Sequence, residues 1–486
     1  MRRTAWGLLM LTGLGVVGCS VGPNYRKAEP NAPARWSRLE ATAATVSDAS
    51  SPGDLAEWWR RLEDPLLSEL VDEAQRQNLN LRNAQARLRE ARARLGVASA
   101  GRYPSVDASV SASRSGSLAG PGLPAGSTMT IGGSQFNAGF DASWELDLFG
   151  GVRRGVEAAQ ADQESAVASL DDARVSLVAE VASTYVEVRS LQSRLEIANN
   201  NLSSQSETLE LTEFRAQAGL VSTQDVEQAR SNREQTLAQI PSLETSLAEA
   251  EHRLDILLGK APGTLHTRLS SAGALPRIPS QVAVGIPADT LRQRPDLRAA
   301  ERKLAAETAR VGVAEAARYP SFSLSGSIGL EVFAQGATGN GTGISYSLLG
   351  SITAPIFNAG RLKNQVKVQD AVREQAEMTY QQAVLTALQD VENALVALAR
   401  NRERGEALAR AAEASRAAAQ LARQRYSAGV IDFQSVIDTE RTVLSVQDSL
   451  ASTNAEEVLA LIRLYKALGG GWTQESKSLS ADKSAS

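Results

Sequence analysis

The chain has 486 residues, a formal net charge of −4, a single cysteine and only 5% aromatic residues. A nucleic-acid-binding face needs clustered basic residues, so this charge balance argues against nucleic acid as a partner, and one cysteine cannot form an intrachain disulfide. Few aromatic residues and long alanine-rich stretches favour close helix–helix packing over large globular cores.

The amino terminus has the pattern of a targeting segment. Two arginines precede an apolar run over residues 6–17, which is too short to span a bilayer. The run ends at Val16-Val17-Gly18-Cys19, which resembles a bacterial lipoprotein box. We therefore expect residues 1–18 to be a lipoprotein signal peptide and Cys19 to carry the lipid, and Ser20 resembles the pattern sorted to the outer membrane. The alternative is an ordinary signal peptide with an incidental cysteine.

The next segment, residues 19–64, is rich in proline, alanine and serine and predicts an extended, lipid-anchored leader. From residue 65 onward apolar residues recur at threes and fours, which predicts a helix over about residues 65–102. Pro104 ends this helix, because its ring disfavours helical geometry in the residue before it.

Four segments alternate between apolar and polar residues with the period of a β-strand. The first two fall within about residues 105–148 and the other two within about residues 321–357. Segments of about ten residues with one apolar face suit strands that cross a membrane at a tilt. A soluble sheet packed on helices would show the same alternation, so both interpretations are open from the sequence.

The number of strands limits the membrane interpretation. Four strands are too few to close around a water-filled interior, because small closed barrels begin near eight strands. If these strands face lipid, several chains must contribute to one barrel, and three chains would supply twelve strands.

Long helical stretches follow each strand pair, with a coiled-coil-like apolar seam. Sixty residues of such a helix would measure roughly 90 Å. The long stretches end in glycine turns at Gly219 and Gly429, with Ser222 and Asp432 as expected N-caps of returning helices. The helices that we expect in these regions cover about residues 152–217, 222–258, 294–318, 360–426 and 432–468.

The chain contains an internal repeat. Leu81–Ser105 and Leu297–Ser321 lie 216 residues apart and are identical at 14 of 25 positions. The segments that follow each copy also match, so we expect two structural repeats, over residues 65–275 and 276–472. Residues 473–486 have the composition of a disordered tail.

Six short motifs are spread over the mature chain. They are Val21-Gly22-Pro23-Asn24-Tyr25, Trp58-Trp59, Asp64-Pro65-Leu66, Leu257–Gly263 (LLGKAPG), Arg294–Glu301 (RPDLRAAE) and Leu464–Trp472 (LYKALGGGW). Together they resemble the TolC-like outer-membrane factor family, in the lipoprotein branch that serves resistance-nodulation-division efflux pumps.

This resemblance implies an α+β membrane protein: a trimeric 12-stranded β-barrel, with four strands per chain, continuous with a long periplasmic α-helical barrel and a small equatorial domain. The implied function is an outer-membrane channel subunit of a tripartite efflux pump, a passive exit duct for drugs or other small toxic molecules. The implied partners are two more copies of the chain (a homotrimer), outer-membrane lipid, a periplasmic adaptor (membrane fusion) protein and an inner-membrane resistance-nodulation-division pump. The resemblance implies no cofactor and no enzymatic activity.

The resemblance also implies a periplasmic aperture. Asp438 stands where the family places an aspartate that faces the pore, and three such carboxylates would form a cation-binding ring; the alternative is a solvated charge. Arg441 stands where an arginine ties the closed helices together. Asp225 and Asp432 are further candidates, with helix capping as the alternative. The turns expected to contact the adaptor carry Gly219, Val221, Gly429 and Ile431.

Two other classes of protein are weighed against this one. For an enzyme, the chain offers His252 and His266 but no H-E-x-x-H or C-x-x-C spacing, so a metal site has no obvious ligands. The glycine-rich residues 336–343 lack the lysine of a phosphate-binding loop. A lipid-anchored coiled-coil periplasmic spacer or adaptor without a pore is the second alternative. Such a protein would stay soluble and monomeric once Cys19 is replaced by serine.

Overall fold

The structure is a computed structural model that describes residues 20–27, 33, 35–37, 46–47, 55–116, 132–271, 273–279, 282–283, 287–335 and 339–472. Cys19, the signal peptide expected before it and the tail expected after residue 472 lie outside the described residues. The chain forms two compact units. Unit 1 takes in residues 20–27, Leu88–Ser165 and Ala300–Tyr380, and unit 2 takes in the remaining described residues. No helix among the described residues is both long and apolar enough to cross a membrane.

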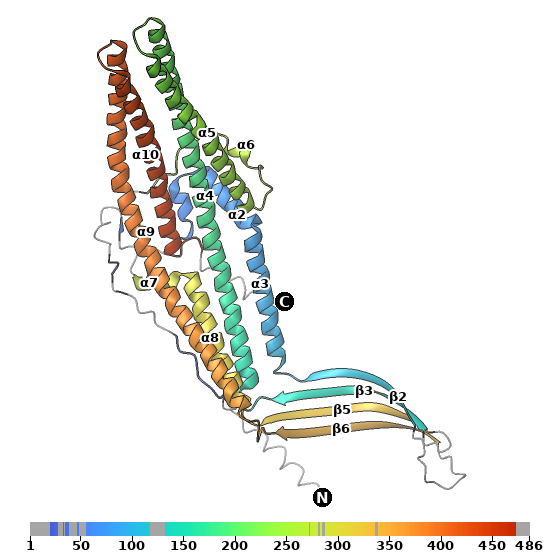
Figure 1. The fold of residues 1–486 in the computed structure, drawn as a ribbon. Coiled ribbons are helices and arrows are strands. Elements are labelled where there is room, and N and C mark those ends of the chain that lie inside the picture. The colour runs from blue at the N-terminus through green and yellow to red at the C-terminus, as the bar shows by residue number, and fades with distance from the viewer. Residues whose placement is uncertain are drawn as a thin grey trace. The chain divides into compact units, whose positions relative to one another are not determined.

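Unit 1 contains a four-stranded antiparallel sheet with the order β2-β3-β5-β6 (Figure 1). The strands are β2 (Ser105–Gly116), β3 (Gly132–Leu146), β5 (Ser321–Gln335) and β6 (Gly339–Thr353). Both expected strand pairs therefore join in one sheet. The glycine-rich residues 336–343 are partly strand, since β6 begins at Gly339.

The strand register separates an apolar face of the sheet from a polar face. One row across the four strands consists of Ala108, Phe140, Ile328 and Tyr346. The neighbouring polar row consists of Asp107, Asp141, Ser327 and Ser347. The large side chains of the apolar row are exposed, and Tyr346 reaches 84%. The described part of the chain therefore does not bury the apolar face of its sheet against its own helices.

Each strand pair of unit 1 is flanked by two helices. α3 (Leu79–Ala100) leads into β2 and α8 (Pro295–Ala316) leads into β5, while α4 (Gly151–Gln217) follows β3 and α9 (Arg361–Ser427) follows β6. Small side chains allow these helices to approach one another closely. Ala161 of α4 packs against Ala305 and Ala306 of α8, and Tyr25 covers this cluster.

The leader residues 20–27 form no helix or strand, but they are fastened to the helices of unit 1. Arg154 of α4 is buried and donates from Nε to the carbonyl oxygen of Val21 at 3.2 Å and from Nη2 to Oδ1 of Asn24 at 2.6 Å. Gly22 lies directly against Gly312 of α8, where a Cβ atom on Gly22 would come within 2.5 Å of the Gly312 Cα. Glycine is therefore required at this contact.

Unit 2 is built mainly from helices, including parts of α3, α4, α8 and α9. Its other elements are η3 (Trp58–Leu62), α2 (Pro65–Gln77), α5 (Thr223–Leu257), α6 (His266–Leu269), α7 (Pro287–Gln293), α10 (Phe433–Ala467) and a short parallel pair, β1 (Val46–Ser47) with β4 (Val282–Ala283). The core of this unit includes Trp58, whose ring stacks on that of Tyr465 with the centroids 5.1 Å apart.

Two expectations about the first hundred residues are wrong. The helix expected over residues 65–102 is two helices, α2 and α3, because Asn78 ends the first and caps the second. The leader expected to be extended over residues 19–64 includes the helix η3, since Trp58, Trp59 and Leu62 are buried in the core of unit 2.

The later helices fall close to their expected positions. The stretches expected over residues 152–217, 222–258, 360–426 and 432–468 are α4, α5, α9 and α10. Corresponding helices of the two halves have equal lengths: 22 residues for α3 and α8, 67 for α4 and α9, and 35 for α5 and α10. These equal lengths are what a duplication of one helix–strand–strand–helix–helix unit would produce.

Candidate functional site at the helix tips

The candidate site lies in unit 2, where α4 turns into α5 and α9 turns into α10 (Figure 1). In the first turn Gly219 has a φ of +74°, which an L-residue adopts only with strain. The amide of Leu220 donates to the carbonyl oxygen of Arg215 at 2.9 Å and closes the end of α4. Ser222 then caps α5 and forms a capping box with Asp225.

The second turn has the same construction. Gly429 has a φ of +75°, and the amide of Val430 donates to the carbonyl oxygen of Arg425 at 2.9 Å. Asp432 caps α10 and accepts from the hydroxyl and the amide of Ser435, at 2.6 and 3.1 Å. These hydrogen bonds lower the pKa of Asp432 below its ordinary value. The expected N-caps, Ser222 and Asp432, are therefore confirmed.

An apolar cluster holds the two turns to their helices. Its buried members are Ala229, Ala422, Tyr426, Phe433, Val436 and Ile437. Val221 and Ile431, which were expected to contact an adaptor, pack against this cluster and are half-buried. The residues before them, Leu220 and Val430, are the exposed apolar side chains of the turns.

Asp438 and Arg441, two of the four residues expected at the aperture, do not contact each other in this structure. Asp438 is exposed, and its Oδ1 accepts from Nε2 of Gln434 one turn earlier at 2.9 Å. Arg441 reaches across to α5, where its Nε donates to Oδ1 of Asn232 at 3.0 Å. Asp438 therefore offers its carboxylate to solvent, while Arg441 links α10 to α5.

Glu440 is a buried carboxylate that the sequence analysis missed. Glu440 is 5% exposed, and its Oε1 accepts a hydrogen bond from the Thr208 hydroxyl of α4 at 2.6 Å. Asn232 approaches Oε2 at 3.5 Å, a long and weak contact. Burial raises the pKa of Glu440, while the Thr208 hydroxyl and the positive charge of Arg423 act in the opposite direction. The signal was present in the sequence, because Glu440 shares the apolar face of α10 with Val436.

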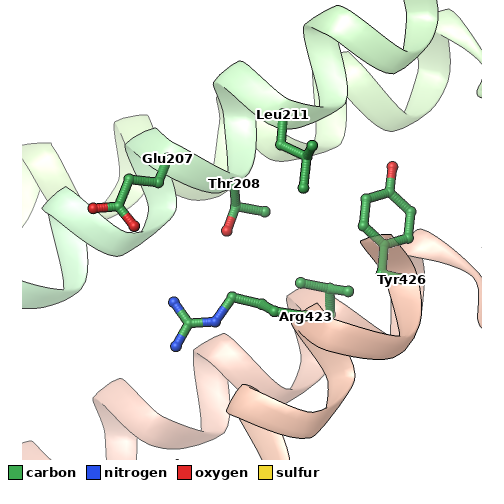
Figure 2. Close-up of a pocket in the computed structure, with 6 residues that line it drawn as sticks. Glu207, Thr208, Leu211, Arg423 and Tyr426 are labelled. Carbon is green, nitrogen blue, oxygen red and sulfur yellow. The ribbon is translucent and has the colours of Figure 1, made fainter. Parts of the chain in front are cut away.

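A cavity of about 150 Å³ lies between α4, α9 and α10, and Thr208, which binds this carboxylate, is part of its lining (Figure 2). It is lined by Glu207, Thr208, Leu211, Arg423, Tyr426 and Val436. Arg423 donates to the hydroxyl of Ser204 on α4, and Arg215 of α4 donates to the Tyr426 carbonyl oxygen and lies over its ring at 4.5 Å. The two long helices are thus joined by polar contacts around a small, mixed cavity.

The two histidines, His252 and His266, do not form a metal site within the described residues. Nδ1 of His266 lies 2.9 Å from Oε2 of Glu251, and this hydrogen bond raises the pKa of His266. His252 is exposed on α5. Over the described ranges, no group of three or more histidine, cysteine, aspartate or glutamate residues is arranged to hold a metal ion.

Comparisons with known proteins agree over most of the chain. The family model described as outer membrane efflux protein matches residues 70–260 and 286–470. Nodulation protein T of Rhizobium leguminosarum bv. trifolii is 35% identical over 468 residues, which cover 95% of this chain and 96% of that protein. The pyoverdine export outer membrane protein OpmQ of Pseudomonas putida is 33% identical over 474 residues, or 96% and 98% of the two chains. The solved structure of the outer-membrane channel OprN superposes with a TM-score of 0.84 at 37% identity, and the match covers 93% of this chain and 100% of that one.

Proposed function

The chain belongs to the outer membrane efflux protein family, and we propose that three copies of it form a passive exit duct for drugs or other small toxic molecules. It is an outer-membrane efflux channel of the kind that serves tripartite pumps. In our proposal the other two components are a periplasmic adaptor and an inner-membrane resistance-nodulation-division pump, which supplies the energy. The relatives' names refer to nodulation and to pyoverdine export, so they do not point to one exported compound for this chain.

The exposed apolar face of the sheet is the observation that carries the proposal. A soluble sheet would bury this face, whereas Phe140, Ile328 and Tyr346 are exposed across three adjacent strands. Strands of 12 to 15 residues are long enough to cross the hydrocarbon layer at a tilt. Because β2 and β6 are the two edges of the sheet, three chains can join edge to edge into a closed barrel of twelve strands.

The same proposal assigns roles to the helix tips. Three copies of Asp438 would form an acidic ring at the periplasmic aperture, because its carboxylate is exposed and has no cationic partner among the described side chains. Arg441, Asp225 and Asp432 would shape the tip through their contacts with α5 and with the two turns. The adaptor would meet the turns that carry Gly219 and Gly429, where Leu220 and Val430 offer exposed apolar contacts.

The lipid anchor completes the proposal. Cys19 would be acylated after removal of residues 1–18, and Ser20 directly follows it. Ser20 packs against Gly150, and the amide of Val21 donates to the carbonyl oxygen of Phe149 at 3.2 Å. Because Phe149 lies just beyond the end of β3, an acyl group on Cys19 would enter the membrane at the end of the sheet from which the helices leave.

Single-channel recording in a planar bilayer tests the duct and its aperture together. We expect a cation-preferring conductance that Asp438→Asn weakens, because asparagine keeps the size of the side chain and its contact with Gln434 but removes the charge. Glu456→Gln removes an exposed carboxylate from the same helix away from the tip and should leave the preference intact. If Asp438→Asn and Glu456→Gln show the same cation preference, Asp438 does not line the aperture. A protein that stays monomeric and water-soluble once Cys19 is replaced by serine would overturn the duct in favour of the spacer.

A further inference from the structure

We propose that the end of the sheet from which the helices leave is a docking surface for anionic phospholipid headgroups, formed by the exposed cations Arg102, Arg361, Lys363 and Lys367. We call these four residues the cationic collar. The inference rests on the proposed duct, because that function places the sheet in the outer membrane, and it adds the class of lipid that the protein selects at its periplasmic boundary.

The antiparallel register brings the collar to one end of the sheet. β2 begins opposite Ser143, near the end of β3, and β5 begins opposite Thr353, the last residue of β6. The starts of β2 and β5 and the ends of β3 and β6 therefore share one end. Arg102 lies three residues before β2, and Arg361 is the first residue of α9, which follows β6 (Figure 1).

The charges of the collar are uncompensated within the described chain. All four side chains are exposed, and none of them has an acidic partner among the residues that the structure describes. Several acidic side chains nearby already have partners: Asp147 pairs with Arg153, Glu157 with Arg154, Glu315 with Arg318, and Asp370 with Arg373. Glu145, exposed near the end of β3, forms no ion pair with the described residues. The four collar cations therefore leave a surplus of positive charge at this end for an external anionic surface.

An apolar and aromatic band lies between the collar and the strands. Tyr103 adjoins Arg102, and Phe357, which is 89% exposed, precedes Arg361 by four residues. Aromatic side chains favour the boundary between hydrocarbon and water, and lysine and arginine can lay their aliphatic stems on apolar surface while the charge reaches the headgroups. Lys367 follows Arg361 by six residues, or about 9 Å of helix, so the collar spans about one headgroup layer.

The leader gives an independent marker for the level of the membrane surface. Ser20 packs against Gly150, and Val21 binds the carbonyl oxygen of Phe149, at the same end of the sheet as the collar. An acyl group on Cys19 would therefore insert at the level of the collar cations. Both features place the headgroups of the inner leaflet of the outer membrane around this end of unit 1.

The test uses the full mature protein, purified in a non-ionic detergent. Its thermal unfolding midpoint is followed while phosphatidylglycerol, phosphatidylcholine or inorganic phosphate is added. The collar variant is R361Q/K363Q/K367Q, and the matched control is R400Q/R402Q/R404Q, which removes three exposed arginines from a later part of the same helix that belongs to unit 2. A conservative variant, K363R/K367R, keeps the charge.

We expect phosphatidylglycerol to raise the midpoint of the wild type, the control and the conservative variant, and added salt to weaken this shift. The collar variant should lose at least half of the shift while keeping its trimer and its conductance, which separates this result from a failure of the duct. An equal phosphatidylglycerol shift in the collar variant overturns the proposal. So does an equal shift of the wild type with phosphatidylcholine, which would show no preference for charge, or with inorganic phosphate, which would show binding of a free anion.

Discussion

At the scale of the residue, Glu440 places a carboxylate inside the junction of α4, α5 and α10. The Thr208 hydroxyl satisfies one of its oxygens at 2.6 Å, while Asn232 approaches the other at 3.5 Å and is itself held by Arg441. Arg423 supplies positive charge from α9. Because a buried carboxylate loses more hydration when charged than when protonated, this junction opposes ionisation of Glu440.

This burial predicts how the tips respond to pH. The folded pKa of Glu440 is raised above the ordinary value of 4.5, so the folded tip binds the proton more tightly than the unfolded one. The stability it contributes is therefore full below pH 4.5 and is lost as the pH rises through the folded pKa. We expect Glu440→Gln, which keeps an acceptor for Thr208, to remove this loss.

Amide hydrogen exchange of the tip residues measures the effect. At each pH the wild type and Glu440→Gln are compared directly, so the intrinsic pH dependence of exchange cancels. We expect nearly equal protection at low pH and several-fold slower exchange in the variant above neutrality, with Glu456→Gln as the control that resembles the wild type. A ratio of wild type to variant that does not change with pH would contradict this account.

At the scale of the element, Asn78 divides a stretch whose apolar spacing continues without interruption. Its Oδ1 accepts from the amide of Leu81 at 2.9 Å and begins α3, while its Nδ2 donates to the carbonyl oxygen of Leu257 at 2.8 Å and ties this junction to the end of α5. Asn78 is buried, so its bond to Leu81 is formed away from solvent, while its bond to Leu257 is partly buried. One side chain therefore serves as a helix cap and as a tertiary contact.

The substitution Asn78→Ala removes both bonds and leaves the partly buried carbonyl oxygen of Leu257 without this donor. We expect a loss of about 1–3 kcal/mol in the free energy of unfolding, measured as a lower midpoint in urea. Asn199→Ala is the control, because Asn199 is exposed inside α4 and bonds only to the Leu195 carbonyl oxygen. Its effect should stay within about 0.5 kcal/mol. Equal losses of unfolding free energy in both variants would show that the two bonds of Asn78 stabilise the fold no more than the single bond of Asn199 does.

These residues show what the sequence could and could not predict. Periodicity predicted the four strand segments and the long helices, and the glycine followed by serine or aspartate predicted both tip turns, since these signals lie within a few neighbouring residues. Glu440 lies on the apolar face of α10, which is visible in the sequence, but its partner Thr208 is 232 residues away. Asn78 caps α3 through the nearby amide of Leu81, but its second bond is to Leu257. Partners so distant in sequence leave no local signal, so these tertiary contacts emerged only from the fold.

At the scale of the whole molecule, the two faces of the sheet decide between a duct and a spacer. Tyr346 and Ser345 are neighbours on β6, and both are exposed, but they belong to opposite faces. If the apolar face meets lipid, an arginine there costs about 2–4 kcal/mol near the middle of the bilayer. The opposite face would meet water and should accept the same change.

We therefore expect Tyr346→Arg to reduce the amount of trimer in the outer membrane strongly and Ser345→Arg to leave it near the wild-type amount. The measurement is the heat-modifiable trimer band from outer-membrane fractions on a gel. Both variants introduce the same charge one position apart in the same strand, so expression and secretion are matched. Equal trimer yields would mean that the two faces meet the same surroundings, and the sheet would not be a membrane wall.

The attachment of the leader by Arg154 has a consequence for how such subunits sit side by side. A slack tether would let each lipid drift around its own protein, but the bonds from Arg154 to Val21 and Asn24 fix the first residues behind the lipid. In a ring of three subunits the fatty chains would then occupy three set positions around the circumference. The lipid would act as a fixed anchor and not as a flexible tether. It would orient each subunit in the membrane before its strands pair with those of the neighbouring subunits.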